Sequence, residues 1–206
     1  MHLSSRQRRI VTAMLAALFV VTASSLFSQV VPATRGGGLP LTVGAGFSLF
    51  DLDYGQDAGT ERRMEGVTAW ANYAVPYTPR ALRGLALEVE GRDINFNRPA
   101  ALVRMRQDTL LGGVSYTWRQ YRNFHPYAKG LLGIGSIDFP PSGTYSHDTR
   151  TVFAPGGGLE YRAFRSLWVR ADYEYQFWPK LFGPHTLDPN GFTIGVAYDF
   201  RRGYQR

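Results

Sequence analysis

The stretch SLWVRADYEYQFW, Ser166 to Trp178, shows two different faces when its residues are taken alternately. The apolar set is Leu167, Val169, Ala171, Tyr173, Tyr175 and Phe177. The other set is Trp168, Arg170, Asp172, Glu174 and Gln176. Successive side chains point to opposite faces of a β-strand, whereas a helix would scatter these apolar residues around its axis. The stretch therefore predicts a long strand with one apolar and one charged face.

The same alternation recurs along the rest of the chain, between segments rich in proline, glycine and charge. Counting the first stretch, it predicts eight strands, over Leu41–Phe50, Met64–Val75, Gly84–Asn95, Arg106–Trp118, Pro126–Ile137, Thr151–Tyr161, Ser166–Trp178 and Gly191–Phe200. The pattern leaves the facing of the fifth strand open, because glycines at 130, 133 and 135 interrupt it. The chain is therefore predicted to be all-β.

Two features modify this regular pattern. Pro155 and the run Gly156–Gly158 predict a bend or bulge in the sixth strand, because proline cannot donate to the ladder and glycine tolerates a kink. The longer segments Asp138–Arg150 and Trp178–Pro189 are rich in turn-forming residues and are predicted to be loops.

The amino-terminal segment has the plan of a secretory signal peptide. A basic start is followed by the apolar run Ile10–Val21 and then by small residues. The run is about twelve residues long, shorter than the roughly 20 that a membrane-spanning helix needs, although an uncleaved anchor is the alternative. The predicted organisation is a signal peptide over 1–28, a flexible lead-in over 29–39, a barrel over 40–200 and a tail over 201–206.

Composition excludes several classes of protein. With 206 residues and 44% hydrophobic content, the chain suits one domain. The absence of cysteine excludes disulfides, thiolate metal sites and a lipid anchor on cysteine. The net charge is +7, and removal of Arg6, Arg8 and Arg9 with the signal peptide leaves +4. Because the strands mix both signs of charge, nucleic acid is not an expected partner.

Alternation alone does not decide which face is inside. A soluble barrel of the lipocalin kind buries its apolar face, whereas a membrane barrel turns that face toward lipid. The strands have about the ten residues that a tilted strand needs to cross a bilayer. Aromatic residues also collect at the strand ends, where amphipathic rings meet the water interfaces. They are Trp70, Tyr73, Tyr116, Trp118, Phe177, Trp178, Tyr198 and Phe200.

The connections supply a third argument for a membrane barrel. Long connections alternate with shorter ones near Pro76, Arg122 and Phe164, as expected for outer loops and periplasmic turns. The inner connections and the tail carry arginines without acids, which suggests contact with anionic lipid or cell-wall polymer, or simply solvated turns. Together these features predict an eight-stranded antiparallel up-and-down transmembrane β-barrel.

A barrel of eight strands is just wide enough to be filled by its own side chains. The charged residues expected to point inward and pair are Glu88, Glu90, Arg92, Glu160, Arg170, Asp172, Glu174 and Asp199. Their predicted role is a structural ionic core, with a proton or ion pathway as the alternative. The membrane-spanning strands are porin-like in their alternation of apolar and polar residues. No continuous open pore is expected, because side chains fill the interior.

Four stretches carry a resemblance to a known family: HPYAKGLLGIG (His125–Gly135), APGGGLEYR (Ala154–Arg162), VRADYEYQF (Val169–Phe177) and GFTIGVAYDF (Gly191–Phe200). The chain resembles bacterial outer-membrane proteins of the small eight-stranded class, similar to the OmpA transmembrane domain and OmpX. The resemblance implies location in the cell outer membrane, insertion by the barrel assembly machinery and contact with outer-membrane lipid and lipopolysaccharide. Members often end on an aromatic residue that this machinery reads, whereas here Phe200 is followed by RRGYQR.

The predicted function is that of a non-enzymatic barrel with a structural or surface-interaction role, in adhesion or envelope integrity, through its outer loops. Its expected partners are outer-membrane lipid, lipopolysaccharide and a surface or cell-wall ligand, and the chain is expected to be a monomer. No catalytic, cofactor-binding or metal-binding residue is predicted. Two alternatives stay open: a lipid A-modifying outer-membrane enzyme and a secreted soluble ligand-binding barrel.

The enzyme alternative rests on the histidines. His147 lies between Ser146 and Asp148, and His125 adjoins a turn proline. A histidine with a serine and a carboxylate is the combination that some lipid-modifying barrels use. Adjacent residues on an extended segment point apart, however, so this is a weak candidate for a triad.

Overall fold

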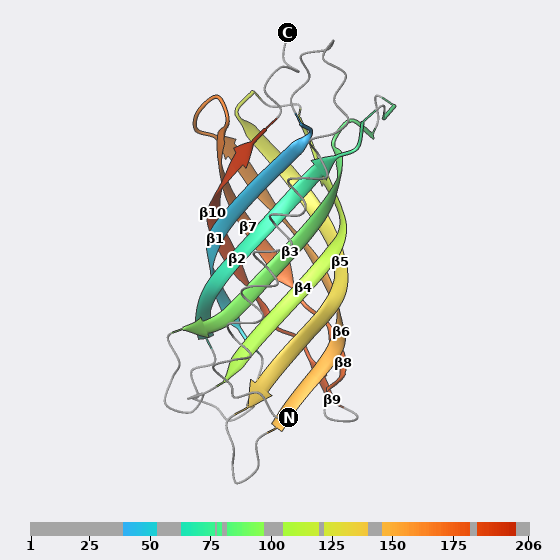
Figure 1. The fold of residues 1–206 in the computed structure, drawn as a ribbon, viewed down its shortest axis with the longest axis vertical. Coiled ribbons are helices and arrows are strands. Elements are labelled where there is room, and N and C mark those ends of the chain that lie inside the picture. Colours follow the sequence, from blue (N-terminus) through green and yellow to red (C-terminus); the bar gives the residue numbers. More distant parts are fainter. Residues whose placement is uncertain are drawn as a thin grey trace, which may run out of the picture. The chain divides into compact units, whose positions relative to one another are not determined.

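A closed antiparallel barrel of eight strands forms the body of the part of the chain that the structure describes (Figure 1). The structure is a computed structural model, and it describes residues 39–52, 63–76, 78–79, 82–96, 105–119, 122–139, 146–181 and 185–200. The predicted signal peptide, nearly all of the lead-in and the tail lie outside these residues. Within them, no helix has the length and apolar character of a membrane-spanning helix.

The barrel strands follow one another around the wall in the order β1-β10-β7-β6-β5-β4-β3-β2. Their bounds are β1 (Leu41–Asp51), β2 (Arg63–Ala74), β3 (Leu85–Phe96), β4 (Arg106–Thr117), β5 (Phe124–Phe139), β6 (Ser146–Arg162), β7 (Leu167–Tyr175) and β10 (Asn190–Asp199). Pairing of β1 with both β2 and β10 closes the sheet without an edge, which removes the unpaired backbone groups that lipid does not tolerate. The predicted fold class is confirmed.

Two segments that were predicted to be loops are partly strand. β5 continues to Phe139 and β6 begins at Ser146, so most of the segment Asp138–Arg150 is strand. The outer part of β6, SHDTRT over 146–151, is polar at every position, but a backbone ladder needs no apolar side chains. The segment Trp178–Pro189 holds a small second sheet, formed by β8 (Trp178–Leu181) and β9 (His185–Leu187).

The predicted bulge in the sixth strand is also wrong. The register of β6 with β5 and β7 runs without a shift past Pro155 and the glycines that follow it. Gly158 instead provides space, because a Cβ at this position would overlap the backbone of Ala171 on β7. The irregularity between β2 and β3 lies at Glu65 and Gly66.

The outer wall of the barrel is apolar, as a membrane barrel requires. Leu110, Leu132 and Ile134 are each 57% exposed, and Phe192 is 64% exposed. Of the aromatic residues expected at the interfaces, Tyr73, Trp118, Phe177, Tyr198 and Phe200 are exposed on this wall. The prediction that Trp70 and Trp178 also lie at the interfaces is wrong, because both side chains point inward and are buried.

The first residue of β1 and the last of β10 lie at the same end of the barrel, where the Phe200 N–H donates to the Leu41 carbonyl at 2.9 Å. We call this the periplasmic end and the opposite end the outer end. Connections alternate between the two ends, as predicted. Their lengths do not alternate strictly, because extension of β5 and β6 shortens the outer connection to 140–145, while the periplasmic connection 75–84 is longer.

Apolar residues close the interior on both sides of a polar middle. Trp70, Trp168 and Ala197 form a buried cluster toward the periplasmic end. Trp70 fits because Gly44 faces it across the β1–β2 ladder, where a Cβ would overlap the indole ring. A larger cluster, the apolar cap, comprises Phe50, Leu52, Met64, Ile94, Met105, Leu111, Leu131, Ile137, Val152, Ala154, Trp178 and Leu187. Most of its members stand at the outer ends of the strands.

Candidate functional site

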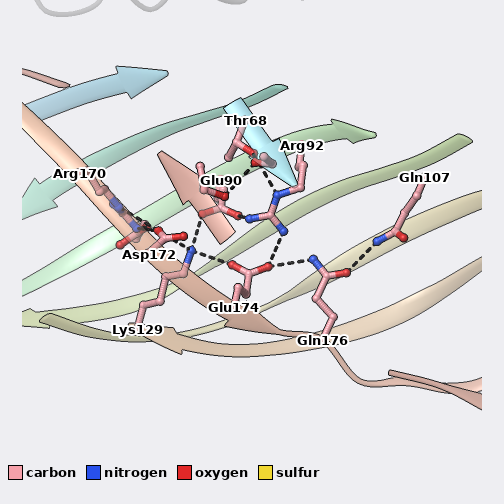
Figure 2. A network of polar contacts seen from close by, with 12 residues as sticks. Thr68, Glu90, Arg92, Gln107, Lys129, Arg170, Asp172, Glu174 and Gln176 are labelled. Carbon is pink, nitrogen blue, oxygen red and sulfur yellow. Dashed lines mark hydrogen bonds and ion pairs between the residues drawn. The ribbon is translucent and has the colours of Figure 1, made fainter. Parts of the chain in front are cut away.

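Lys129 on β5 lies at the centre of a buried ionic network between these two clusters (Figure 2). Its Nζ is 2.6 Å from Glu90 Oε2, 2.7 Å from Glu174 Oε2 and 3.4 Å from Asp172 Oδ2. The lysine side chain and the three carboxylate side chains are all at most 3% exposed. One ammonium group therefore joins carboxylates from β3 and β7 across the bore.

Arg92 joins two of the same carboxylates from the other side. Its Nη2 lies 2.6 Å from Glu90 Oε1 and its Nη1 lies 2.6 Å from Glu174 Oε1. Its Nε donates to Thr68 Oγ1 at 3.0 Å, and its guanidinium lies over the Phe50 ring at 4.1 Å from the centroid. The planar guanidinium thus has partners at its edge and on its face.

Arg170 forms the periplasmic side of the network. Its Nη2 lies 2.7 Å from Glu88 Oε1, and its Nε donates to the Tyr127 hydroxyl at 2.7 Å. That hydroxyl donates in turn to Asp172 Oδ2 at 2.6 Å. The Arg170 guanidinium also lies over the rings of Trp70 and Tyr127, at 4.8 and 4.4 Å from their centroids. The network is therefore packed directly against the tryptophan cluster.

On the outer side, neutral groups connect the network to the apolar cap. Gln176 Nε2 donates to Glu174 Oε1 at 2.8 Å, and Gln176 Oε1 accepts bonds from Gln107 Nε2 at 2.8 Å and from Trp178 Nε1 at 3.0 Å. Trp178 is fully buried in the cap. The polarity of the interior thus falls in steps from ions through amides to apolar side chains.

Most of the inward charges predicted from the sequence belong to this network. They are Glu88, Glu90, Arg92, Arg170, Asp172 and Glu174. Glu160 and Asp199 lie on the same face but are only half-buried near the periplasmic end. They make interactions there and are not part of the buried network.

Sequence reasoning missed Lys129, Tyr127 and Gln107. Lys129 is the single charged residue of the predicted fifth strand, Pro126–Ile137, and a charge at the middle of a strand is costly on the lipid face. That argument places Lys129 inward together with Tyr127 and Leu131, and places Leu132 on the lipid face, as the structure has them.

This arrangement fills the bore with side chains. Four carboxylates contact three cations, so the charges nearly balance and one acid is in excess. Clusters of buried apolar residues lie on both sides of these charges. Within the described residues, the interior is a structural core, as predicted from the strand count.

The histidines lie far from this core. His125 stacks against Trp168 at 4.8 Å between ring centroids, at the periplasmic end. His147 is near the outer end of β6, where its Nδ1 contacts Asp138 Oδ1. Asp148 points to the other face and pairs with Arg150 at 3.0 Å, so the candidate triad of Ser146, His147 and Asp148 is not brought together. Among the described residues, no group of three His, Cys, Asp or Glu side chains could hold a metal ion.

Comparison with protein families agrees with this architecture. A model described as "Outer membrane protein beta-barrel domain" matches residues 13–200. The chain belongs to this family. It is accordingly a protein of the bacterial outer membrane, with an apolar wall that faces lipid. A search of curated proteins finds no match.

Solved structures share the fold at low sequence identity. Neisserial surface protein A has 15% identity and a TM-score of 0.56, and the match covers 78% of this chain and 96% of that chain. The N-terminal β-barrel domain of Pseudomonas aeruginosa OprF has 12% identity and a TM-score of 0.54, with 78% and 99% covered. Ail, the attachment invasion locus protein of Yersinia pestis, has 15% identity and a TM-score of 0.52, with 81% and 100% covered. At these identities the likeness shows the fold alone.

Proposed function

We propose that this protein acts at the cell surface as a structural and surface-interaction barrel, with a role in adhesion or envelope integrity. The observation that carries the proposal is the filled interior. Lys129, Arg92 and Arg170 occupy the bore together with their carboxylate partners, and the apolar cap lies between them and the outer end. Because the described residues leave no passage through the bore, the outer surface is the part of the protein that remains available for interaction.

The outer end offers an extended surface for this role. β5 and β6 have 16 and 17 residues, whereas the other barrel strands have 9 to 12. β6 pairs continuously with β7 only over Gly156–Arg162, so its first half forms a ribbon with β5 (Figure 1). One fold neighbour is the attachment invasion locus protein of Yersinia pestis, whose name is in keeping with a contact role.

The soluble ligand-binding alternative is not favoured. Such a barrel would need an apolar interior able to enclose a ligand, whereas here ions fill the middle of the bore. The proposed partners are therefore outer-membrane lipid and lipopolysaccharide around the wall, the barrel assembly machinery during insertion, and a surface or cell-wall ligand at the outer end. The proposed state is a monomer.

The test replaces the outer connections 53–62, 97–104 and 140–145 and the segment 182–184 between β8 and β9, singly and together, with short glycine-serine linkers. The matched control replaces the periplasmic connection 78–83 in the same way. Bacteria that express each full-length variant are measured for adhesion to cultured epithelial cells and for sensitivity to detergent. A faster-migrating band in unboiled gel samples verifies the folded barrel in each case.

We expect the outer replacements to lower adhesion or detergent resistance and the periplasmic replacement to change neither. Unchanged adhesion and resistance in the variant with all four replacements would refute the proposed role.

A further inference from the structure

A polar patch covers the exterior wall at the outer ends of β3, β4, β5 and β6. The strand register places its members in two rows across the four strands. The row nearer the apolar wall consists of Asp93, Asp108, Ser136 and Thr149, and the row nearer the strand ends consists of Arg106, Asp138 and His147, with Asn95 two residues beyond Asp93 on β3. These side chains lie on the same face of their strands as the lipid-exposed residues nearer the middle of the barrel. They therefore point outward and not into the bore.

Within this patch, His147 connects a carboxylate to two hydroxyl groups. Its Nδ1 contacts Asp138 Oδ1, and its Nε2 lies 3.2 Å from Thr149 Oγ1 and 3.5 Å from Ser136 Oγ. An ionised carboxylate only accepts hydrogen bonds, so Asp138 holds the proton of the neutral imidazole on Nδ1 and leaves Nε2 as an acceptor. A hydroxyl, a histidine and a carboxylate in this order form the arrangement that activates a serine nucleophile.

The position of the three groups indicates the substrate. Ser136 is two residues beyond Ile134 on β5, which is 57% exposed on the lipid-facing wall. Two residues of a strand span about 6.6 Å, so the hydroxyl lies just outside the apolar belt. The ester bonds between acyl chains and headgroups of outer-leaflet lipids occupy this boundary. The imidazole is half exposed, so a lipid that diffuses along the wall can reach it.

We propose that Ser136, His147 and Asp138 form a hydrolytic site for the acyl esters of outer-leaflet lipids. This activity goes beyond the proposed surface role and departs from the expectation that the chain is not an enzyme. It also differs from the triad considered from the sequence, since the serine and the carboxylate come from β5 and not from the neighbours of His147 along the chain.

The reaction is ester hydrolysis with water as the second reactant. Ser136 Oγ attacks the acyl carbonyl while its proton passes to His147 Nε2, and the Thr149 hydroxyl, which also lies beside Nε2, can donate to the developing oxyanion. The carbon–oxygen bond to the headgroup breaks, and the imidazolium returns the proton to the leaving alkoxide. Water then attacks the acyl-serine and gives its proton to His147, which releases the fatty acid and restores Ser136. Asp138 acts through His147 as a positioning residue.

The experiment uses the purified full chain in two kinds of vesicle, one of phospholipid alone and one that also contains lipopolysaccharide. Released fatty acids are identified by mass spectrometry, and the acyl chains distinguish the two sources of ester. A fluorophosphonate probe measures the reactivity of the serine independently of any lipid. The variants are Ser136→Ala, His147→Ala and Asp138→Asn, and the controls are Ser166→Ala and His125→Gln near the periplasmic end.

We expect fatty acid release from at least one vesicle type, and a fall of about 100-fold or more in Ser136→Ala and His147→Ala. Asp138→Asn should lower kcat with little change in KM, and Asp138→Glu should recover part of the loss. Both controls should retain full activity. Absence of release from both vesicle types, or release and probe labelling that persist in Ser136→Ala, would overturn this proposal and leave the surface role intact. Gel migration of unboiled samples excludes misfolding as the cause of a loss.

Discussion

The ionic network and the apolar cap are equally buried, but they hold the barrel together in different ways. Lys129 and Leu131 illustrate the contrast, because they are two residues apart on the same inward face of β5. Lys129 contributes attraction only while its carboxylate partners are present and suitably placed. Leu131 contributes through area removed from water and through contacts that do not depend on the identity of a single partner.

The contrast shows why the interior can be polar at all. Burial of an ion costs several kcal/mol, and attraction to its partners offsets this cost only when every member is present. The network meets this condition because Glu90 and Glu174 each contact both Lys129 and Arg92. In the cap, by contrast, the loss of one side chain leaves a cavity but no unpaired charge.

The largest effect is expected for Lys129→Met, which preserves most of the volume and removes the charge. Three carboxylates then lose a cation, and the free energy of unfolding should fall by about 3–5 kcal/mol. The measurement is urea unfolding in phospholipid vesicles. Lys180→Met, at the exposed second lysine of the sequence, is the control and should change stability by no more than about 0.5 kcal/mol. An equal loss in both variants would show that the network contributes nothing specific.

A smaller effect is expected for Leu131→Ala, the apolar counterpart on the same strand. Removal of this fully buried side chain leaves a cavity and should lower the free energy of unfolding by about 2–3 kcal/mol. Combination with Lys129→Met tests whether the two regions are independent, since separate contributions add and coupled ones do not. Leu132→Ala is the control, because that neighbour faces lipid at 57% exposure. A cost at Leu132 as large as that at Leu131 would contradict the assignment of faces.

Which residues of the charged strand share one face was predictable from the sequence, because alternation fixes it, and the evidence for a membrane barrel then turned the charged face inward. Arg170, Asp172 and Glu174 occur at every second position, and a one-residue slip would turn all of them toward lipid. The partners of these residues were less predictable. Lys129 lies among glycines that carry no facing signal, so only the cost of a lysine in lipid could place it inward.

The outer end was the least predictable region. The start of β6, SHDTRT over 146–151, is polar at every position, so no alternation of apolar and polar residues marks it as strand. Its pairing depends on the backbone ladder between β5 and β6, which composition does not reveal. Trp178 ends the alternating stretch and was placed at a water interface for that reason, although it begins β8 and fills the cap.

The smallest effect is expected for Arg106→Gln, which removes an ion pair from the exterior patch. Arg106 lies 2.9 Å from Asp93 and 3.0 Å from Asp108, distances close to those of the buried pairs, but its side chain is 37% exposed. Water and salt screen charges at such a site, so the loss should stay below about 1 kcal/mol and shrink as salt is added. The loss in Lys129→Met should hardly respond to salt, because its partners are buried. If the two variants lost similar free energy at every salt concentration, burial would not be the reason that the interior network stabilises the barrel.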